Sequence, residues 1–174
     1  TPRNTAFRNK FAVANKVNPD VYALQGDDAA QMLAIGLAAV KGDMGKQEAE
    51  FNEAFGHLKE YFPDSLTPRI IAFNSGFNYG VLPTDSVLGF GVEWFVGKDS
   101  RVVGYLSPDV FPQYRKDRMR PEMLAPSVVK GWLQVHYTRD VRDEDLLTNF
   151  VVIGKVMALL DALLPGTDAT LKFA

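Results

Sequence analysis

The sequence lacks cysteine altogether and has only two histidines, His57 and His136, among its 174 residues. The absence of cysteine excludes disulfides, cysteine nucleophiles and metal sites with thiolate ligands. Two histidines exclude a three-histidine metal centre. The sequence also contains no HExxH, GxSxG, GxGxxG or phosphate-loop motif. We therefore expect no metal and no cofactor, and the missing motifs argue against an enzyme.

A strong charge of one sign and a long hydrophobic run are missing too. Lys and Arg total 19 and Asp and Glu total 21, which gives no electrostatic reason to expect a nucleic acid as partner. No uninterrupted apolar run reaches roughly 18 residues, so we expect no membrane-spanning helix. The chain begins at Thr1 without Met or an apolar leader. We expect it to be a processed or trimmed part, with any targeting segment upstream.

Apolar residues at helical spacing dominate both ends of the chain. The clearest stripe repeats at intervals of four and three residues and predicts a buried helix face: Phe51, Phe55, Leu58 and Phe62. We predict helices over 7–14, closed by Pro19; over 27–42; over 48–62, stopped by Pro63; within 108–119; over 126–137; and over 143–164. The last of these is apolar almost all round, so we expect it at the centre of the domain.

Three segments in the middle of the chain predict strands: 70–73, 77–82 and 87–97. In the third, alternation places Gly89, Gly91 and Glu93 on one face. Glycines in a strand often mark close approach by another group. Either a helix packs tightly over the two glycines, which we favour, or they line a small pocket that contains Glu93.

Lys155 is the one cation within the apolar segment 146–164. Because a buried lysine is costly unless it is paired, we predict that Lys155 is bonded to an acidic side chain. Glu93 is the first candidate partner, followed by Asp161 and Asp85. These four residues form the candidate polar cluster of the sequence.

The basic run 115–120 could bind phosphate. The acidic residues near it favour instead a solvated, partly ion-paired surface.

These patterns predict an α+β fold, a mostly helical single domain over 1–174 with a small mixed sheet. Several blocks, in the same order, also resemble one known family. They include FGHLKEYFP at 55–63, PRIIAFNSGFNY at 68–79 and TDSVLGFGVEWFVG at 84–97. Further blocks lie at 111–114, 118–119, 124–132, 154–155 and 160–165. The chain resembles the gliding-motility lipoprotein GldB family, most strongly over 55–165.

The resemblance implies an exported bacterial lipoprotein, acylated on a cysteine upstream of Thr1. It implies a location in the cell envelope, lipid-anchored and facing the periplasm. Relatives in gliding bacteria are required for surface motility, and others occur in bacteria that do not glide. The partners implied are envelope proteins, and the membrane through the N-terminal lipid anchor.

The family is also similar to a group of predicted zinc peptidases with a zincin-like fold. In that comparison helix 126–137 would carry the HExxH motif, but Val128 to Trp132 offer no metal ligand. A second helix has Ile153 before Gly154, where relatives often carry glutamate. The resemblance therefore implies a zincin-like fold whose metal site has been lost.

Three functions follow from these observations. The first is a non-catalytic lipoprotein domain that binds protein partners in a motility or secretion-linked assembly. The second is a carboxylate-based or remnant peptidase-like hydrolase, which needs Glu93, Asp85 and Asp161 to converge in an open cleft. The third is a glycan or small-ligand binding module, which needs an exposed concave surface lined by aromatic side chains: Tyr79, Trp94, Tyr114 and Trp132.

Overall fold

The computed structural model describes residues 2–18, 44–138 and 145–173. Its regular elements follow in chain order: α1 (Pro2–Asn15), α3 (Gly45–Tyr61), β1 (Arg69–Phe73), β2 (Val81–Pro83), β3 (Val87–Gly91), η1 (Val92–Phe95), α4 (Arg101–Gly104), α5 (Gln113–Lys116), η2 (Pro121–Met123), α6 (Leu124–His136), α7 (Leu146–Leu163) and α8 (Ala169–Lys172). Helices around a small sheet confirm the predicted α+β class. The helix predicted over 27–42 lies outside the described residues.

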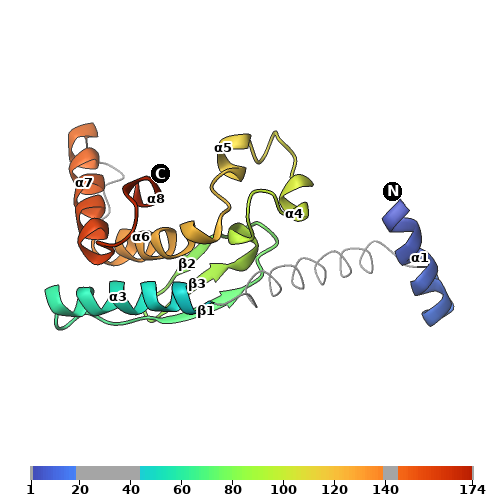
Figure 1. The fold of residues 1–174 in the computed structure, drawn as a ribbon, viewed down its shortest axis with the longest axis horizontal. Helices are drawn as coiled ribbons and strands as arrows, with labels where there is room; N and C mark the ends of the chain where they lie inside the picture. Colours follow the sequence, from blue (N-terminus) through green and yellow to red (C-terminus); the bar gives the residue numbers. More distant parts are fainter. Residues whose placement is uncertain (1, 19–43, 139–144, 174) are drawn as a thin grey trace.

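The sheet has three strands in the order β1-β3-β2 and is mixed (Figure 1). β1 pairs with β3 in parallel, with Ile71 opposite Gly89, and β2 pairs with β3 in antiparallel, with Leu82 also opposite Gly89. The central strand β3 is therefore covered along both edges. This arrangement confirms the small mixed sheet predicted from the sequence.

Two strand predictions are wrong in extent. The second strand begins at Val81 instead of residue 77, because Phe77 has a φ of 63° that no extended strand accommodates. The third strand ends at Gly91, and residues 92–95 form a 3₁₀ helix. Side chains alternate between the two faces of a sheet only within a strand. Because Glu93 lies beyond the end of β3, it does not share a strand face with Gly89 and Gly91.

The core lies where α3 and α6 pack on one another and on the sheet. α3 buries the predicted stripe through Phe51, Phe55 and Leu58, while Phe62 lies just beyond the helix and is 40% exposed. On α6, the indole of Trp132 meets the ring of Phe55 edge-on, with 6.3 Å between centroids. A smaller apolar cluster lies under the loops at the other end of the sheet: Phe77, Val102, Val103 and Met119.

α7 is positioned differently from the prediction. It begins where the carboxylate of Asp145 accepts a hydrogen bond from the Thr148 N–H at 2.8 Å, a regular N-cap. Figure 1 shows α7 standing across the ends of α3 and α6, with its first turns extending away from both. Its buried side chains are Val156, Leu160 and Leu163, all in the second half. The expectation that this helix lies at the centre of the domain is therefore wrong.

α1 confirms the helix predicted over 7–14 and is described by itself, since residues 19–43 are not described. The rings of Phe7 and Phe11, one helical turn apart, pack at a tilted angle with 5.7 Å between their centroids. α8 follows α7 and packs beside α7 and α6. Its N-cap is Asp168, whose carboxylate accepts a hydrogen bond from the Thr170 N–H at 2.7 Å.

Candidate functional site

Glu93 is a buried acidic residue with 1% exposure. One carboxylate oxygen, Oε1, accepts hydrogen bonds from the backbone N–H of Ser75 at 2.7 Å, from the Phe77 N–H at 3.0 Å and from the Ser75 hydroxyl. The other oxygen, Oε2, is buried without a partner among the described residues. Glu93 therefore holds the loop between β1 and β2, which is a structural role.

The loop that Glu93 holds has an unusual backbone. Gly76 and Phe77 follow one another with φ values of 61° and 63°. Phenylalanine rarely adopts this left-handed region, and the strain typically amounts to about 1–3 kcal/mol. The bonds to the Glu93 carboxylate come from both sides of Gly76 and stabilise this conformation. No signal in the sequence identified Ser75 and Phe77 as the donors.

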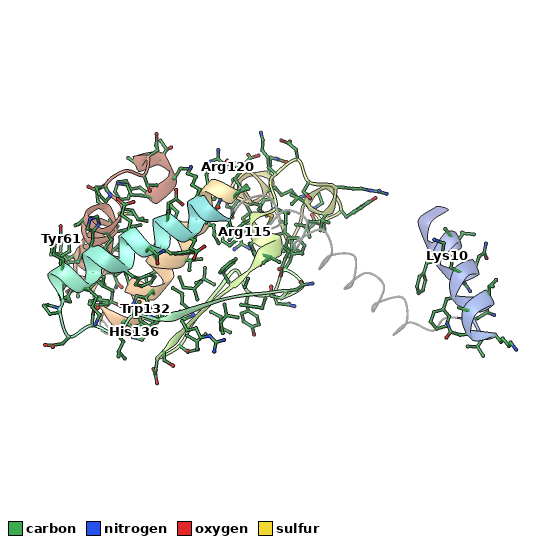
Figure 2. All side chains as sticks on the ribbon, turned by 60° about the horizontal axis from the view of Figure 1, so that its bottom comes forward. Lys10, Tyr61, Arg115, Arg120, Trp132 and His136 are labelled. Carbon is green, nitrogen blue, oxygen red and sulfur yellow. The ribbon has the colours of Figure 1, made fainter. Side chains whose placement is uncertain are left out.

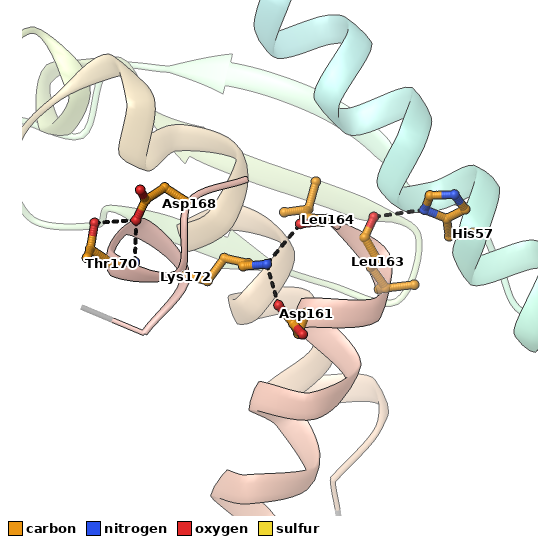
Figure 3. Close-up of polar contacts among 7 residues, drawn as sticks. All are labelled: His57, Asp161, Leu163, Leu164, Asp168, Thr170 and Lys172. Carbon is orange, nitrogen blue, oxygen red and sulfur yellow. Dashed lines mark hydrogen bonds and ion pairs between the residues drawn. The ribbon is translucent and has the colours of Figure 1, made fainter. Parts of the chain in front are cut away.

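The other members of the candidate polar cluster are not brought to Glu93. Asp85 is exposed in the turn between β2 and β3, and Lys155 is exposed on α7. The prediction that Lys155 is buried and paired with Glu93 is wrong, because α7 turns this side chain to solvent. Asp161 instead forms an ion pair with Lys172 of α8, as Figure 3 shows.

The Asp161–Lys172 pair joins the C-terminal turn of α7 to α8. The Lys172 side chain is 3% exposed and Asp161 is 59% exposed, so the pair is buried from one side only. Lys172 also donates to the Leu164 carbonyl at 3.1 Å (Figure 3). Asp161 was among the predicted acidic partners, but its cation is Lys172 and not Lys155. The buried cation of the C-terminal region is Lys172, which lies outside α7.

Gly89 and Gly91 line no pocket for Glu93. A Cβ on Gly91 would lie 2.4 Å from the backbone oxygen of Tyr79, and one on Gly89 would lie 2.9 Å from the ring of Phe73. The favoured interpretation, a helix packed tightly over both glycines, is therefore right about the close packing and wrong about the helix. The packing groups are a strand side chain and a loop backbone rather than the helix we expected.

The two histidines and the aromatic residues form no shared surface. His57 contacts the Leu163 carbonyl at 3.1 Å (Figure 3), and His136 stacks on Trp132 at 3.7 Å. Trp132 is 1% exposed, so it is part of the core. Trp94 packs between Phe77 and Phe111, whereas both candidate tyrosines, Tyr79 and Tyr114, are exposed. This arrangement does not favour a glycan-binding platform.

Among the described residues, α7 carries several exposed large apolar side chains. Five residues spaced three and four apart lie on one side of this helix, and we call them the α7 stripe: Leu147, Phe150, Val151, Gly154 and Ala158. Leu147 is 72% exposed and Phe150 61%. No atom of a neighbouring element lies within 4 Å of a Cβ placed on Gly154. Near its first turns, Leu147 and Val151 share a hollow with Tyr137 and Thr138, which follow α6. Among the described residues, the five members of the stripe are all exposed, so a partner can reach them.

By length and composition, α7 is one helix that could cross a membrane, and only 17% of it is buried. The expectation of no such segment needs correction, because four polar residues interrupt the run without lowering its average hydropathy below that of a spanning helix: Thr148, Asn149, Lys155 and Asp161. Among the described residues, no group of three His, Asp or Glu side chains is placed to hold a metal ion.

Two carboxyl groups outside the cluster have shifted pKa values. Burial raises the pKa of Glu50 on α3, and Lys46, 3.8 Å away, partly opposes this shift. Hydrogen bonds from the side chain and backbone of Thr170 lower the pKa of Asp168. Both groups have local explanations in helix structure, and neither lies beside Glu93. They do not add a reactive centre to the site.

The fold and the site together define an α+β domain whose buried carboxylate is architectural and whose unusual feature is an uncovered apolar helix. The chain belongs to the gliding motility protein GldB family, whose model matches residues 6–174. This match confirms the family resemblance and extends it to nearly the whole chain. The family is one of gliding motility-associated lipoproteins, and its name indicates a lipid-anchored envelope protein. The zincin-like relationship has no support.

No curated protein matches the sequence, and no solved structure matches it either.

Proposed function

We propose that this domain faces the periplasm and acts by binding another envelope protein through the α7 stripe, within a motility or secretion-linked assembly. The observation that carries the proposal is the exposure of large apolar side chains on a helix that is otherwise well formed and capped. Contiguous exposed apolar surface on a soluble domain typically marks an interaction site. Membership of the lipoprotein family supports the proposed location, and the exposed stripe supports the proposed contact.

The chemistry of the stripe fits an apolar helix of the partner. Leu147, Phe150 and Val151 provide bulk at one end, while Gly154 and Ala158 provide a shallow region at the other. Residues at this spacing form the seam of a helix pair, in which large side chains of one helix fill spaces beside small residues of the other. Lys155 borders the stripe and would meet a carboxylate of the partner at the rim.

A protein partner is favoured over direct contact with the bilayer surface. Helices that lie in the interface of a membrane carry many Lys and Arg residues on their polar face, which attract anionic lipids. The polar residues of α7 include one cation, Lys155, and one anion, Asp161. This balance gives no electrostatic attraction to anionic lipid headgroups.

Site-specific cross-linking in intact cells tests the proposal with the full lipoprotein. A photo-reactive residue replaces Phe150 in one variant and Val110 in a control, since both wild-type side chains are 61% exposed. We expect an adduct with one protein from position 150 and none from position 110. The protein identified is then purified, and its Kd is measured against wild type, Phe150→Ser and Val110→Ser.

The expected result is a Kd at least about tenfold weaker for Phe150→Ser, equivalent to ~1.4 kcal/mol, with Val110→Ser behaving as wild type. Adducts that contain only lipid, or only a second copy of this chain, overturn the proposal. Equal affinity of Phe150→Ser and wild type for the captured protein also overturns it. Because Phe150 is exposed, its replacement leaves folding intact, and a thermal melt checks this point.

A further inference from the structure

A cavity of about 550 Å³ lies between α6, the start of β2, η1 and the segment from α5 to Met123. One face of α6 forms its floor through residues spaced three or four apart: Ser127, Lys130, Gly131 and Gln134. The volume is within the range of about 300–1,000 Å³ that is usual for small-ligand sites. The cavity shares no residue with the α7 stripe.

The charged residues that line the cavity are all cations: Arg115, Arg118, Lys130 and Lys172. Lys172 is neutralised by Asp161, which lies outside the cavity. Among the described residues, the other three form no ion pair, so the expectation that the run 115–120 is partly ion-paired does not hold for Arg115 and Arg118. Three uncompensated cations gather here in a chain of net charge −2.

The positive charges of Arg118 and Lys130 repel one another. Burial lowers the pKa of Lys130, and the nearby positive charge of Arg118 lowers it further. Like charges held close together in partial burial are unfavourable, and a bound anion would remove that cost. The guanidinium groups of Arg115 and Arg118 supply the forked donor geometry that carboxylate and phosphate oxygens accept.

The rest of the cavity wall is mostly apolar. Trp94 and Phe95 contribute from η1, Met119 and Met123 from the segment before α6, and Leu171 from α8. Methionine side chains adapt to ligands of different shape. A ligand that satisfied the cations alone would leave this surface in contact with water, so the cavity suits a molecule with both an anionic and an apolar part.

We propose that this cavity binds a small amphipathic anion, in which a carboxylate or phosphate group is attached to an apolar body. The anionic group lies against Arg115, Arg118 and Lys130, and the apolar body lies against Trp94 and the two methionines. The ligand has two sources of the same chemistry: a free organic acid or phosphate ester, and the headgroup end of an anionic lipid. This site is independent of protein binding by α7.

Tryptophan fluorescence measures binding directly, because Trp94 lines the cavity and the only other tryptophan, Trp132, is buried away from it. The probes are decanoate and decyl phosphate below their micelle concentrations, with decyl maltoside as a neutral amphiphile and inorganic phosphate as an anion without an apolar part. We expect saturable binding of the two anionic amphiphiles, and binding at least about tenfold weaker for the other two probes, equivalent to ~1.4 kcal/mol.

The variants Arg118→Gln and Arg120→Gln form a matched pair. Both arginines are exposed and belong to the same basic run, but Arg120 does not line the cavity. In the view of Figure 2, Arg115 and Arg120 are labelled apart from Trp132 and His136. Arg118→Gln should weaken decyl phosphate binding about tenfold or more through the loss of a charge-assisted hydrogen bond, while Arg120→Gln should bind as wild type.

Equal binding of decyl maltoside and decyl phosphate overturns the proposal, as does equal weakening by the two variants. Vesicles that contain phosphatidic acid distinguish the two sources of ligand. Binding to these vesicles that Arg118→Gln weakens identifies the lipid headgroup. Binding of monomeric decyl phosphate without binding to the vesicles identifies a free anion.

Discussion

α6 and α7 show that the more apolar of two helices can be the less buried. α6 buries seven of its thirteen residues against α3 and the sheet, although it carries polar groups such as Lys130 and Gln134. α7 is longer and more apolar, yet buries three of eighteen residues. Composition measures how much apolar surface a helix offers. Burial depends on how many neighbours reach that surface, and in the first half of α7 the described neighbours, such as Tyr137 and Thr138, leave every side chain at least partly exposed.

The same contrast applies to glycines in the two helices. Gly131 of α6 lets the helix approach β2, because a Cβ there would lie 2.8 Å from Val81 Cγ1. Gly154 of α7 has open space around it. In α6 the missing side chain permits packing within the domain. In α7 it is available for packing against another molecule, which is why the comparison supports a binding role for α7.

The largest effects are expected from a matched pair of leucines. Leu133→Ala on α6 removes a side chain with 0% exposure and should lower the free energy of unfolding by about 2–5 kcal/mol, through lost apolar burial and the cavity left behind. Leu147→Ala on α7, where the side chain is 72% exposed, should change it by less than about 0.5 kcal/mol. Urea denaturation measures both. A comparable loss for Leu147→Ala would show that another part of the chain covers the stripe.

A pair of charged residues comes next. Glu93→Ala leaves the N–H groups of Ser75 and Phe77 without their acceptor and should cost about 3 kcal/mol. Glu93→Gln keeps one acceptor oxygen and should cost less. Lys155→Met should change stability by less than about 0.5 kcal/mol, because Lys155 is exposed. The unfolding free energies of the three variants rank these effects, and a loss of several kcal/mol for Lys155→Met would restore the buried pair predicted from the sequence.

The two helical glycines should respond with opposite signs. Gly131→Ala forces Val81 or the α6 backbone to move and should destabilise the domain by about 1–3 kcal/mol. Gly154→Ala meets no atom and gains helix propensity, so it should stabilise α7 by about 0.5–1 kcal/mol. Thermal melts give both signs. Destabilisation by Gly154→Ala would contradict the open stripe.

The smallest effect concerns Lys130 and its dependence on pH. Because burial and Arg118 lower the pKa of Lys130 in the folded state, the unfolded chain binds more protons as pH rises from the lowered pKa toward 10.5. The stability cost of this lysine is therefore complete below the lowered pKa and declines as pH rises. Lys130→Met should raise Tm at pH 7 by about 1–2 °C. The gain should be smaller at pH 10, and a gain that grows with pH would contradict the sign of the shift.

Predictions from the sequence were most accurate where they depended on residues close to one another in the chain. The apolar repeat of Phe51, Phe55 and Leu58, the stop before Pro63 and the start of the last long helix within a few residues of position 143 all depend on residues close to one another in sequence. The predictions failed at Glu93, whose partners Ser75 and Phe77 lie sixteen or more residues away. Nothing in the alternating pattern of 87–97 indicates that the strand ends at Gly91, where the backbone packs closely against the Tyr79 carbonyl.

By itself the sequence determined the α+β class, the approximate positions of the described helices, the mixed sheet and the family, since caps, periodicity and ordered sequence blocks are properties of the chain. Only the tertiary structure decided that Lys172 is the cation bonded to Asp161, that Arg115, Arg118 and Lys130 share a cavity, and that α7 presents an apolar side to its surroundings. The physical reason is that burial and pairing are relations between distant segments. An apolar or charged residue carries its chemistry in the sequence, but the neighbour that covers or pairs with it is chosen by the fold.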